Sequence, residues 1–303
     1  MIIRFIGFLL SFFGGAGICA AAVPSVTVSI APLHSVAAAV MDGVGTPRLL
    51  LSPAVSVHDY RLKPSDMKKL SETGVLFWGG PDLETFLPKA VEASGLPGRS
   101  EALMTAPGVV LYPAFSGGVR ADGNGGGTAD PHFWLSPANM AAAARRIAEV
   151  LSGEDPEHAD TYRENARRFE KRMEQLAAET RESLKDQRGK PYFVFHDAYR
   201  YFEKTADLPA AGSVVADAHH AGGARRVAQI REKIKQSGPA CLFTEPQMPE
   251  KHVQTLSENL PVHTGVLDPL GEGLTPGKDF YVELIGKLTH SLKACLSELP
   301  AAE

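Results

Sequence analysis

Short hydrophobic runs alternate with longer amphipathic segments along this chain. The runs are Val26–Ile30, Arg48–Leu51, Val75–Trp78, Val109–Tyr112, Tyr192–Phe195, Gly212–Val215, Cys241–Thr244 and Thr264–Leu267. Most are continuously apolar and do not alternate with polar residues, as expected of strands buried on both faces of a parallel sheet. The repeated order of strand and helix predicts an α/β fold.

Helix starts are marked by capping residues and prolines. Ser136-Pro137 and Asp155-Pro156 each place a capping side chain before a proline at the first helical position, and Pro64 begins another helix. Asp155-Pro156 opens a charged segment that continues to about Gln187. Its apolar positions, which step by three and four along one narrow stripe, are Ala159, Tyr162, Ala166, Phe169, Met173 and Leu176.

This long helix divides the hydrophobic runs into two groups of four. At 1.5 Å per residue it is about 45 Å long, longer than a small domain. We therefore predict two lobes, each a mostly parallel sheet flanked by helices, joined by one long helix. The expected boundaries are 23–155 for the N-terminal lobe, 156–188 for the linking helix and 189–303 for the C-terminal lobe.

The first 22 residues have the pattern of a secretory signal peptide. Arg4 precedes an apolar stretch that ends in Ala20-Ala21-Ala22, a small-residue cleavage pattern. The alternative is an uncleaved membrane anchor, which the glycines at 14, 15 and 17 and Pro24 disfavour. Export leaves Cys241 and Cys295, either as a disulfide or as two buried thiols. We expect a periplasmic protein cleaved near Ala22.

Bulk composition excludes some classes of partner. The 303 residues carry a net charge of −4, and no dense run of lysine or arginine stands out, so nucleic acid is not an expected partner. The segment Ser116–Asp130 is rich in glycine but lacks the Lys-Ser or Lys-Thr ending of a phosphate-binding loop. It is expected to form a surface loop.

Three of the ten histidines have distinctive neighbours. They are His58 in Ser-Val-His-Asp-Tyr, His132 in Asp-Pro-His-Phe-Trp, and His196, which directly follows an apolar run. Asp268 and Glu245 also follow such runs, and ligands of open α/β sheets bind at the carboxyl ends of the strands. Separations of 64 to 74 residues fit no local metal finger, so spacing alone leaves a metal site undecided.

Five motifs together resemble the ZnuA-type zinc-binding proteins of ABC importers. The motifs are Val55–Tyr60 with Lys63–Asp66, Asp130–Pro137, Tyr192–Glu203, Cys241–Gln247 and Leu267–Gly271. They occur in the order found in that family, and the likeness extends over residues 26–296. The resemblance implies two α/β lobes joined by one long helix, with a metal ion in the cleft between them.

The resemblance also implies roles for particular residues. His58, His132 and His196 match the family's three zinc-binding imidazoles, and Asp268 matches a carboxylate that binds the metal in some relatives. Cys241 and Cys295 match a disulfide of zinc-specific members. Because imidazole nitrogen suits zinc while manganese prefers oxygen, three histidines favour Zn²⁺, with Asp268 or water as fourth ligand.

Glu245 and Asp59 are predicted to orient imidazoles through their second nitrogen, although Asp59 is equally interpreted as a local cap.

Two departures from the family weaken the inference of zinc specificity. Val57 replaces a glutamate found in some members, and the Gly-rich segment replaces a long His/Asp-rich loop. His34 and the pair His219-His220 are weaker candidates for the cleft and for a second site.

We therefore predict a monomeric, non-catalytic protein that captures Zn²⁺ and delivers it to a membrane permease. One alternative is a manganese or iron carrier, or an adhesin, of the same superfamily. Another is a three-histidine zinc hydrolase, since an open zinc position activates water. The sequence contains neither an HExxH nor a GxSxG motif, so neither of these hydrolase patterns is supported.

Overall fold

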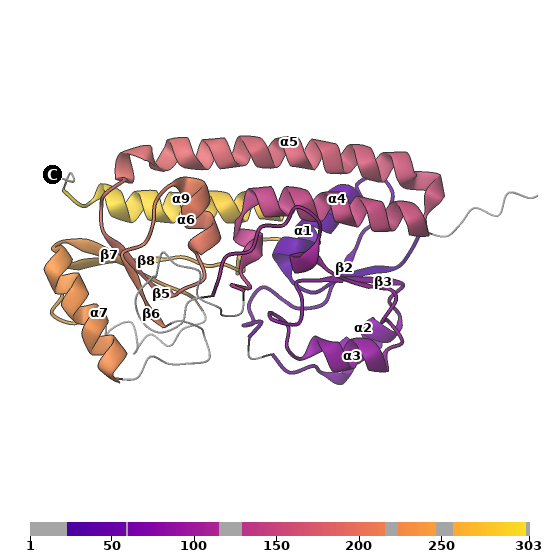
Figure 1. Ribbon diagram of the computed structural model, residues 1–303, viewed down its shortest axis with the longest axis horizontal. Coiled ribbons are helices and arrows are strands. Elements are labelled where there is room, and N and C mark those ends of the chain that lie inside the picture. Colours follow the sequence, from indigo (N-terminus) through magenta and orange to yellow (C-terminus); the bar gives the residue numbers. More distant parts are fainter. Residues whose placement is uncertain (1–22, 59, 115–128, 216–223, 247–256, 301–303) are drawn as a thin grey trace, which may run out of the picture.

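The computed structural model describes residues 23–58, 60–114, 129–215, 224–246 and 257–300. It contains two four-stranded sheets that lie beneath one long helix, α5 (Figure 1). We call the half built on the first sheet the N-terminal lobe and the half built on the second sheet the C-terminal lobe. The predicted α/β architecture with two parallel sheets is confirmed.

Both sheets are parallel throughout and have the same strand order. The N-terminal sheet has the order β2-β1-β3-β4 and the C-terminal sheet the order β6-β5-β7-β8. The strands are β1 (Val26–Val28), β2 (Arg48–Leu49), β3 (Val75–Trp78), β4 (Ser100–Ala102), β5 (Tyr192–His196), β6 (Gly212–Val215), β7 (Ala240–Thr244) and β8 (Val262–Val266). Because the strands are parallel, the carboxyl ends of β1 and β3 lie at one edge of the N-terminal sheet, and those of β5 and β7 lie at one edge of the C-terminal sheet.

One predicted strand is wrong. Val109–Tyr112 is not a strand, and the fourth strand of the N-terminal sheet is β4, a short polar segment. Glu101 of β4 is held by two hydrogen bonds from Arg146, at 2.8 and 2.9 Å, which stabilise a charged residue in a strand. Val110 is 57% exposed, so the apolar run at 109–112 does not mark a buried strand.

Eight α-helices are described. They are α1 (Ala31–Val40), α2 (Pro64–Ser71), α3 (Leu87–Ala93), α4 (Pro137–Glu154), α5 (Ala159–Leu184), α6 (Arg200–Ala206), α7 (Ala224–Ser237) and α9 (Phe280–Ser297). Short 3₁₀ turns occupy Leu103–Thr105, Phe133–Leu135, Pro156–His158 and Lys185–Gln187. None of these helices has both the length and the apolar character needed to cross a membrane.

Two of the predicted helix starts can be compared directly. Ser136 caps α4 as predicted, since its hydroxyl accepts the backbone N–H of Asn139 at 3.3 Å. At Asp155 the prediction needs correction, because residues 156–158 form a 3₁₀ turn and α5 begins at Ala159. The Asp155 carboxylate instead accepts hydrogen bonds from the His158 ring and the Tyr162 hydroxyl, both at 2.8 Å.

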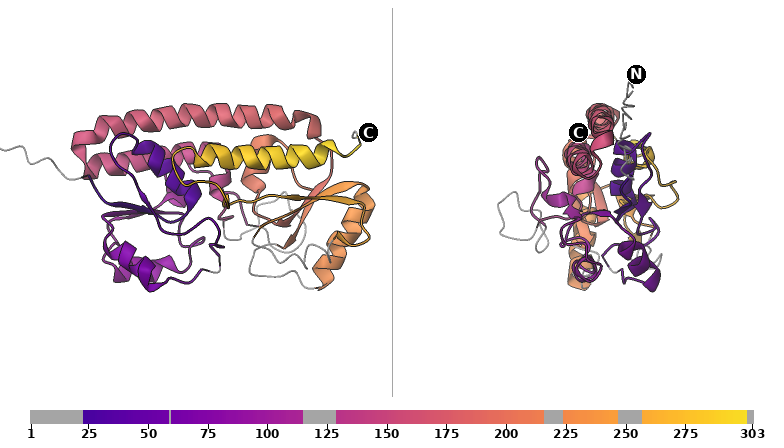
Figure 2. Two further views of the ribbon diagram at one scale, coloured as in Figure 1. Left: turned by 180° about the vertical axis from the view of Figure 1, so that it is seen from behind. Right: turned by 90° about the vertical axis from the view of Figure 1, so that its right-hand side faces the viewer.

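The long helix extends over both lobes, as predicted, but it does not connect them alone. Figures 1 and 2 show α9 beside α5, running from the middle of the molecule along the C-terminal lobe to the C-terminus, and α9 also contacts α1. The Ser35 hydroxyl of α1 accepts the backbone N–H of Tyr281 and donates to the carbonyl of Lys278, both at 3.0 Å. One continuous hydrophobic core accordingly contains residues of both lobes.

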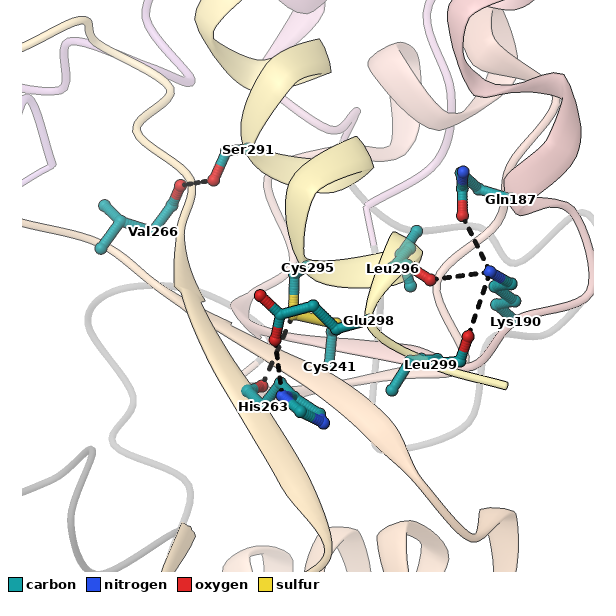
Figure 3. Close-up of a disulfide and its surroundings, with 10 residues drawn as sticks. All are labelled: Gln187, Lys190, Cys241, His263, Val266, Ser291, Cys295, Leu296, Glu298 and Leu299. Carbon is teal, nitrogen blue, oxygen red and sulfur yellow. Dashed lines mark hydrogen bonds and ion pairs between the residues drawn. A yellow bond between two sulfur atoms is a disulfide. The ribbon is translucent and has the colours of Figure 1, made fainter. Parts of the chain in front are cut away.

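The predicted disulfide is present and joins α9 to the C-terminal sheet. Cys241 of β7 and Cys295 of α9 are bonded, and both are buried (Figure 3). Lys190 adds hydrogen bonds to the end of α9, with its ammonium group 2.8 Å from the carbonyl of Leu296. This end of the C-terminal lobe is therefore held by covalent and polar contacts.

Candidate metal centre

His196 is the last residue of β5, at the carboxyl edge of the C-terminal sheet. Glu245 directly follows β7, the parallel neighbour of β5, so the two side chains meet at this edge. Nδ1 of His196 lies 3.2 Å from Oε1 of Glu245. Nε2 of His196 is buried and has no hydrogen-bond partner, which is unusual for a buried polar atom. This nitrogen is therefore free to bind an electrophile.

Tyr199 supports the same carboxylate. Its hydroxyl lies 3.1 Å from Oε1 of Glu245 and 2.8 Å from the carbonyl oxygen of Leu267. Burial raises the pKa of Tyr199 well above its usual value, and the negative charges of Glu245 and Asp268 add to this effect. The phenol therefore stays protonated and remains a hydrogen-bond donor. Sequence reasoning did not identify Tyr199, although it lies three residues after His196.

His132 belongs to the N-terminal lobe and has its own carboxylate partner. Oδ1 of Asp130 accepts the backbone N–H of His132 at 3.0 Å and lies 2.8 Å from Nδ1 of its ring. Asp130 is 4% exposed and His132 is also 4% exposed, so little water competes for this hydrogen bond. Sequence reasoning missed the role of Asp130; the signal that could have revealed it is a carboxylate two residues before the histidine.

The segment after His132 is anchored on the C-terminal lobe. The indole N–H of Trp134 donates to the carbonyl of Pro269 at 2.9 Å, and the Tyr281 hydroxyl donates to the carbonyl of Trp134 at 2.7 Å. Trp134 is fully buried, and its ring lies 5.2 Å from that of His132. These bonds place a histidine of one lobe against the other lobe.

His58 comes from the loop between β2 and α2, and the buried side chain of the preceding Val57 anchors it. Nε2 of His58 lies 3.1 Å from Nε2 of His132. The ring of His196 lies 5.6 Å from that of His58 and 4.7 Å from that of His132, edge to face in both cases. Three imidazoles from distant parts of the chain thus converge between the two lobes.

One nitrogen of each imidazole lies within 4.8 Å of the others, and no other group of three potential metal ligands occurs among the described residues. Tetrahedral zinc with Zn–N bonds of 2.0–2.1 Å has N···N edges of about 3.3 Å. The 3.1 Å separation between His58 and His132 is close to that edge. The donor set therefore fits a zinc ion.

Charge is distributed unequally over the buried rings. Burial, together with the positive charge of His196, lowers the pKa of His132 to about 3, against the opposing carboxylates of Glu245 and Asp197. Burial also disfavours the charged form of His196. The charge and hydrogen bond of Glu245, together with Asp130 and Asp197, nevertheless raise its pKa above the usual value. Of these two rings, His196 is therefore the one that takes up a proton more readily.

Asp268, which follows β8, lies outside the group of three imidazoles. One of its oxygens accepts the backbone N–H of Leu270 at 3.0 Å, and the other accepts that of Glu272. His34 lies in the first turn of α1, with Nε2 2.9 Å from the carbonyl of Pro47, and is not part of the group either. Asp59 and the pair His219-His220 lie outside the described residues.

Comparisons with known proteins agree on one family. The model of the family described as "Zinc-uptake complex component A periplasmic" (ZnuA) matches residues 26–295. A protein of Brucella suis described as "High-affinity zinc uptake system protein ZnuA" is 40% identical over 320 residues, covering 93% of this chain and 96% of the relative.

Solved structures share the fold. A zinc-bound ZnuA with residues 138–173 deleted has a TM-score of 0.76 at 22% identity, with 91% of this chain and 99% of that one covered. The periplasmic zinc-binding protein TroA of Treponema pallidum has a TM-score of 0.76 at 19% identity, with 90% and 99% covered. At these identities the likeness supports the architecture alone.

Proposed function

Because this chain belongs to the periplasmic zinc-uptake component A (ZnuA) family, we propose that it captures Zn²⁺ and delivers it to the permease of an ABC importer. The ion is the cargo of the protein. The observation that carries the proposal is the convergence of His58, His132 and His196, with one nitrogen of each within 4.8 Å of the others.

The second nitrogens of two rings support zinc as the cargo. Asp130 and Glu245 each lie within hydrogen-bond distance of an Nδ1 atom, which leaves the Nε2 atoms of His132 and His196 for the ion. A carboxylate on the far nitrogen fixes the orientation of the ring and makes it a better donor. Three nitrogen donors favour zinc over manganese, which prefers oxygen.

Asp268 or a water molecule completes the tetrahedron in this proposal. A carboxylate has about four lone-pair positions, and the two backbone N–H groups of Leu270 and Glu272 take one on each oxygen of Asp268. The carboxylate therefore retains the capacity to bind a cation. We propose Asp59 as a further residue that orients an imidazole, on the basis of its position next to His58.

The family is periplasmic, and we propose that residues 1–22 are the signal peptide that directs export. Residues 23–155, 156–188 and 189–303 form the N-terminal lobe, the linking helix and the C-terminal lobe of the mature protein in this proposal. We further propose that the protein acts as a monomer and binds no nucleic acid, consistent with its net charge of −4.

Zinc binding to the purified, chelator-treated protein tests the proposal. We expect one tight Zn²⁺ site per chain, measured by competition with a chromogenic chelator, and weaker binding of Mn²⁺ in the same assay. His290→Ala is the matched control because His290 is an exposed histidine of α9 and is not part of the group of three imidazoles. Absence of zinc binding by the wild-type protein, or equal loss in His290→Ala and His132→Ala, would overturn the proposal.

A further inference from the structure

Two consecutive residues of α6, in the C-terminal lobe, bind a pair of adjoining segments of the N-terminal lobe, one at Tyr112 and Pro113 and the other at Asp130. The guanidinium group of Arg200 donates to the carbonyl of Pro113 at 2.7 Å and lies 5.7 Å from the centre of the Tyr112 ring. The Tyr201 hydroxyl donates to the carbonyl of Asp130 at 2.8 Å and accepts the backbone N–H of Tyr112 at 3.1 Å.

The Tyr201 hydroxyl completes a closed set of hydrogen bonds. The backbone N–H of Asp130 donates to the carbonyl of Tyr112 at 2.8 Å, so each of these two residues is bonded to the other and to the same hydroxyl. Tyr201 is 1% exposed, and its ring lies 4.9 Å from that of Tyr112. Removal of the hydroxyl therefore leaves the buried carbonyl of Asp130 and the partly buried N–H of Tyr112 without this partner.

These bonds connect two metal-binding side chains by a short route. Helix α6 begins four residues after His196, and Tyr201 holds the backbone of Asp130. The Asp130 carboxylate in turn holds both the backbone N–H and the ring of His132. The Tyr201 phenol and the Asp130 carboxylate therefore form a further link, beside the Trp134 contacts, between the His132 ring and the helix that follows His196.

We propose that Tyr201 is a positioning residue for zinc capture, which fixes Asp130 from the opposite lobe so that the His132 imidazole faces that of His196. The proposal rests on the proposed function, because it assigns zinc to these two rings. It explains how ligands from separate lobes lie 4.7 Å apart, measured between ring centres. A preorganised site binds more tightly because less conformational freedom is lost on binding.

Tyr201→Phe tests this role because it keeps the aromatic ring and removes only the hydroxyl. The matched control is Tyr192→Phe. Tyr192 is also 1% exposed and also donates to a backbone carbonyl, that of Leu208, at 2.8 Å, but it lies at the amino end of β5. We expect Tyr201→Phe to weaken zinc binding by about tenfold and Tyr192→Phe to leave it within about twofold, although both lower stability without metal.

A double-mutant cycle with Asp130→Ala separates positioning from a general loss of packing. If Tyr201 acts through Asp130, Tyr201→Phe should have little further effect on zinc affinity in the Asp130→Ala background. Independent, additive effects would overturn the proposal, as would an unchanged affinity of Tyr201→Phe in a wild-type background that binds zinc. Failure of the wild-type protein itself to bind zinc would instead reject the proposed function.

Discussion

In the N-terminal sheet, β1 and β3 are followed by Ser29 and Gly79, whereas in the C-terminal sheet the corresponding strands, β5 and β7, lead to His196 and Glu245. A carboxylate lies at each edge, fully buried in the case of Glu84 and partly buried in the case of Glu245. Glu84 accepts the Ser29 hydroxyl at 2.5 Å and the backbone N–H groups of Gly79 and Gly80 at 3.1 and 2.9 Å. Its hydrogen bonds are all internal to the N-terminal lobe.

The C-terminal edge uses its carboxylate differently. Glu245 lies beside the imidazole of His196, whose other nitrogen has no hydrogen-bond partner. Burial raises the pKa of Glu84 to about 7, against the opposing hydrogen bonds from Ser29, Gly80 and Gly79. Two sheets with the same strand order thus differ in chemistry. At the edge of the N-terminal sheet the carboxylate makes only internal hydrogen bonds, whereas the edge of the C-terminal sheet presents a buried nitrogen donor. The topology provides the edge, and the residues at the strand ends decide its use.

Exchange of the two strand-end residues for alanine should show the largest difference between the lobes. We expect His196→Ala to weaken zinc binding on the order of 1,000-fold, about 4 kcal/mol, because one of three imidazole donors is lost. Ser29→Ala should lower the free energy of unfolding by about 1–2 kcal/mol, since Glu84 loses a donor, with zinc affinity little changed. Chelator competition and urea unfolding measure the two quantities.

If Ser29→Ala weakened zinc binding as much as His196→Ala, the contrast between the two sheet edges would be wrong. Such an outcome would mean that the N-terminal edge also contributes to the metal site. His290→Ala again controls for removal of a histidine without removal of a ligand.

The two lobes also differ in packing. The N-terminal sheet lies within the large core, whereas one side of the C-terminal sheet packs on a separate small cluster. That cluster consists of Phe193, Val214, Val215, Ile230, Ile234, Ala240 and Leu242. The disulfide from β7 to α9 therefore stabilises the lobe that has the less continuous core.

Removal of this disulfide tests the difference in packing. The bond closes a loop with a sequence separation of 54, for which loop entropy gives up to about 4 kcal/mol of stabilisation. We expect the double variant Cys241→Ala/Cys295→Ala to lose up to that amount of unfolding free energy. Hydrogen exchange should accelerate more in β6, β7 and β8 than in β1 and β3. Equal acceleration in both sheets would show that the lobes open as one unit.

The carboxylates that orient the imidazoles should have smaller effects. Asp130→Asn and Glu245→Gln each weaken the contact to an Nδ1 atom while keeping a side chain of similar shape. We expect zinc affinity to fall by about 10–100-fold in each variant, the range typical of residues that orient a metal ligand. Chelator competition at pH 8 measures the loss, with Glu84→Gln as the control from the other edge. An unchanged affinity in both variants would mean that the rings are held by packing alone.

Most of the fold was predictable because buried parallel strands leave a strong local pattern. Val75–Trp78 and Gly212–Val215 have the predicted bounds. The errors occurred at segments whose hydrophobic pattern does not reflect their place in the tertiary structure. Ser100–Ala102 carries no hydrophobic run and is a strand only because it pairs with β3 and because Arg146 binds Glu101. Val109–Tyr112 is apolar, but hydrophobicity alone does not show whether a sheet edge is free to receive it.

The candidate site was less accessible from local pattern. His196 could be chosen because it ends a strand, whereas His58 and His132 lie outside the strands, and their convergence depends on contacts between lobes. Their selection required the family resemblance. The hydrogen bond between the Tyr281 backbone and the Ser35 hydroxyl, which also connects the lobes, joins residues 246 positions apart in the sequence and has no local sequence signal.

The pH dependence of zinc binding is the smallest and most graded of the expected effects. Zinc requires neutral imidazoles, and Glu245 raises the pKa of His196 above the usual histidine value. At pH values below this raised pKa, a proton therefore competes with the metal for His196. Below that pKa, protonation of His196 alone should lower zinc affinity by about tenfold per pH unit, and binding should release the proton of His196, measurable by calorimetry in buffers of different ionisation enthalpy. His132 keeps a pKa of about 3 and adds no second proton above pH 5. In Glu245→Gln the decline should begin at lower pH; an unchanged onset would show that Glu245 does not control the protonation of His196.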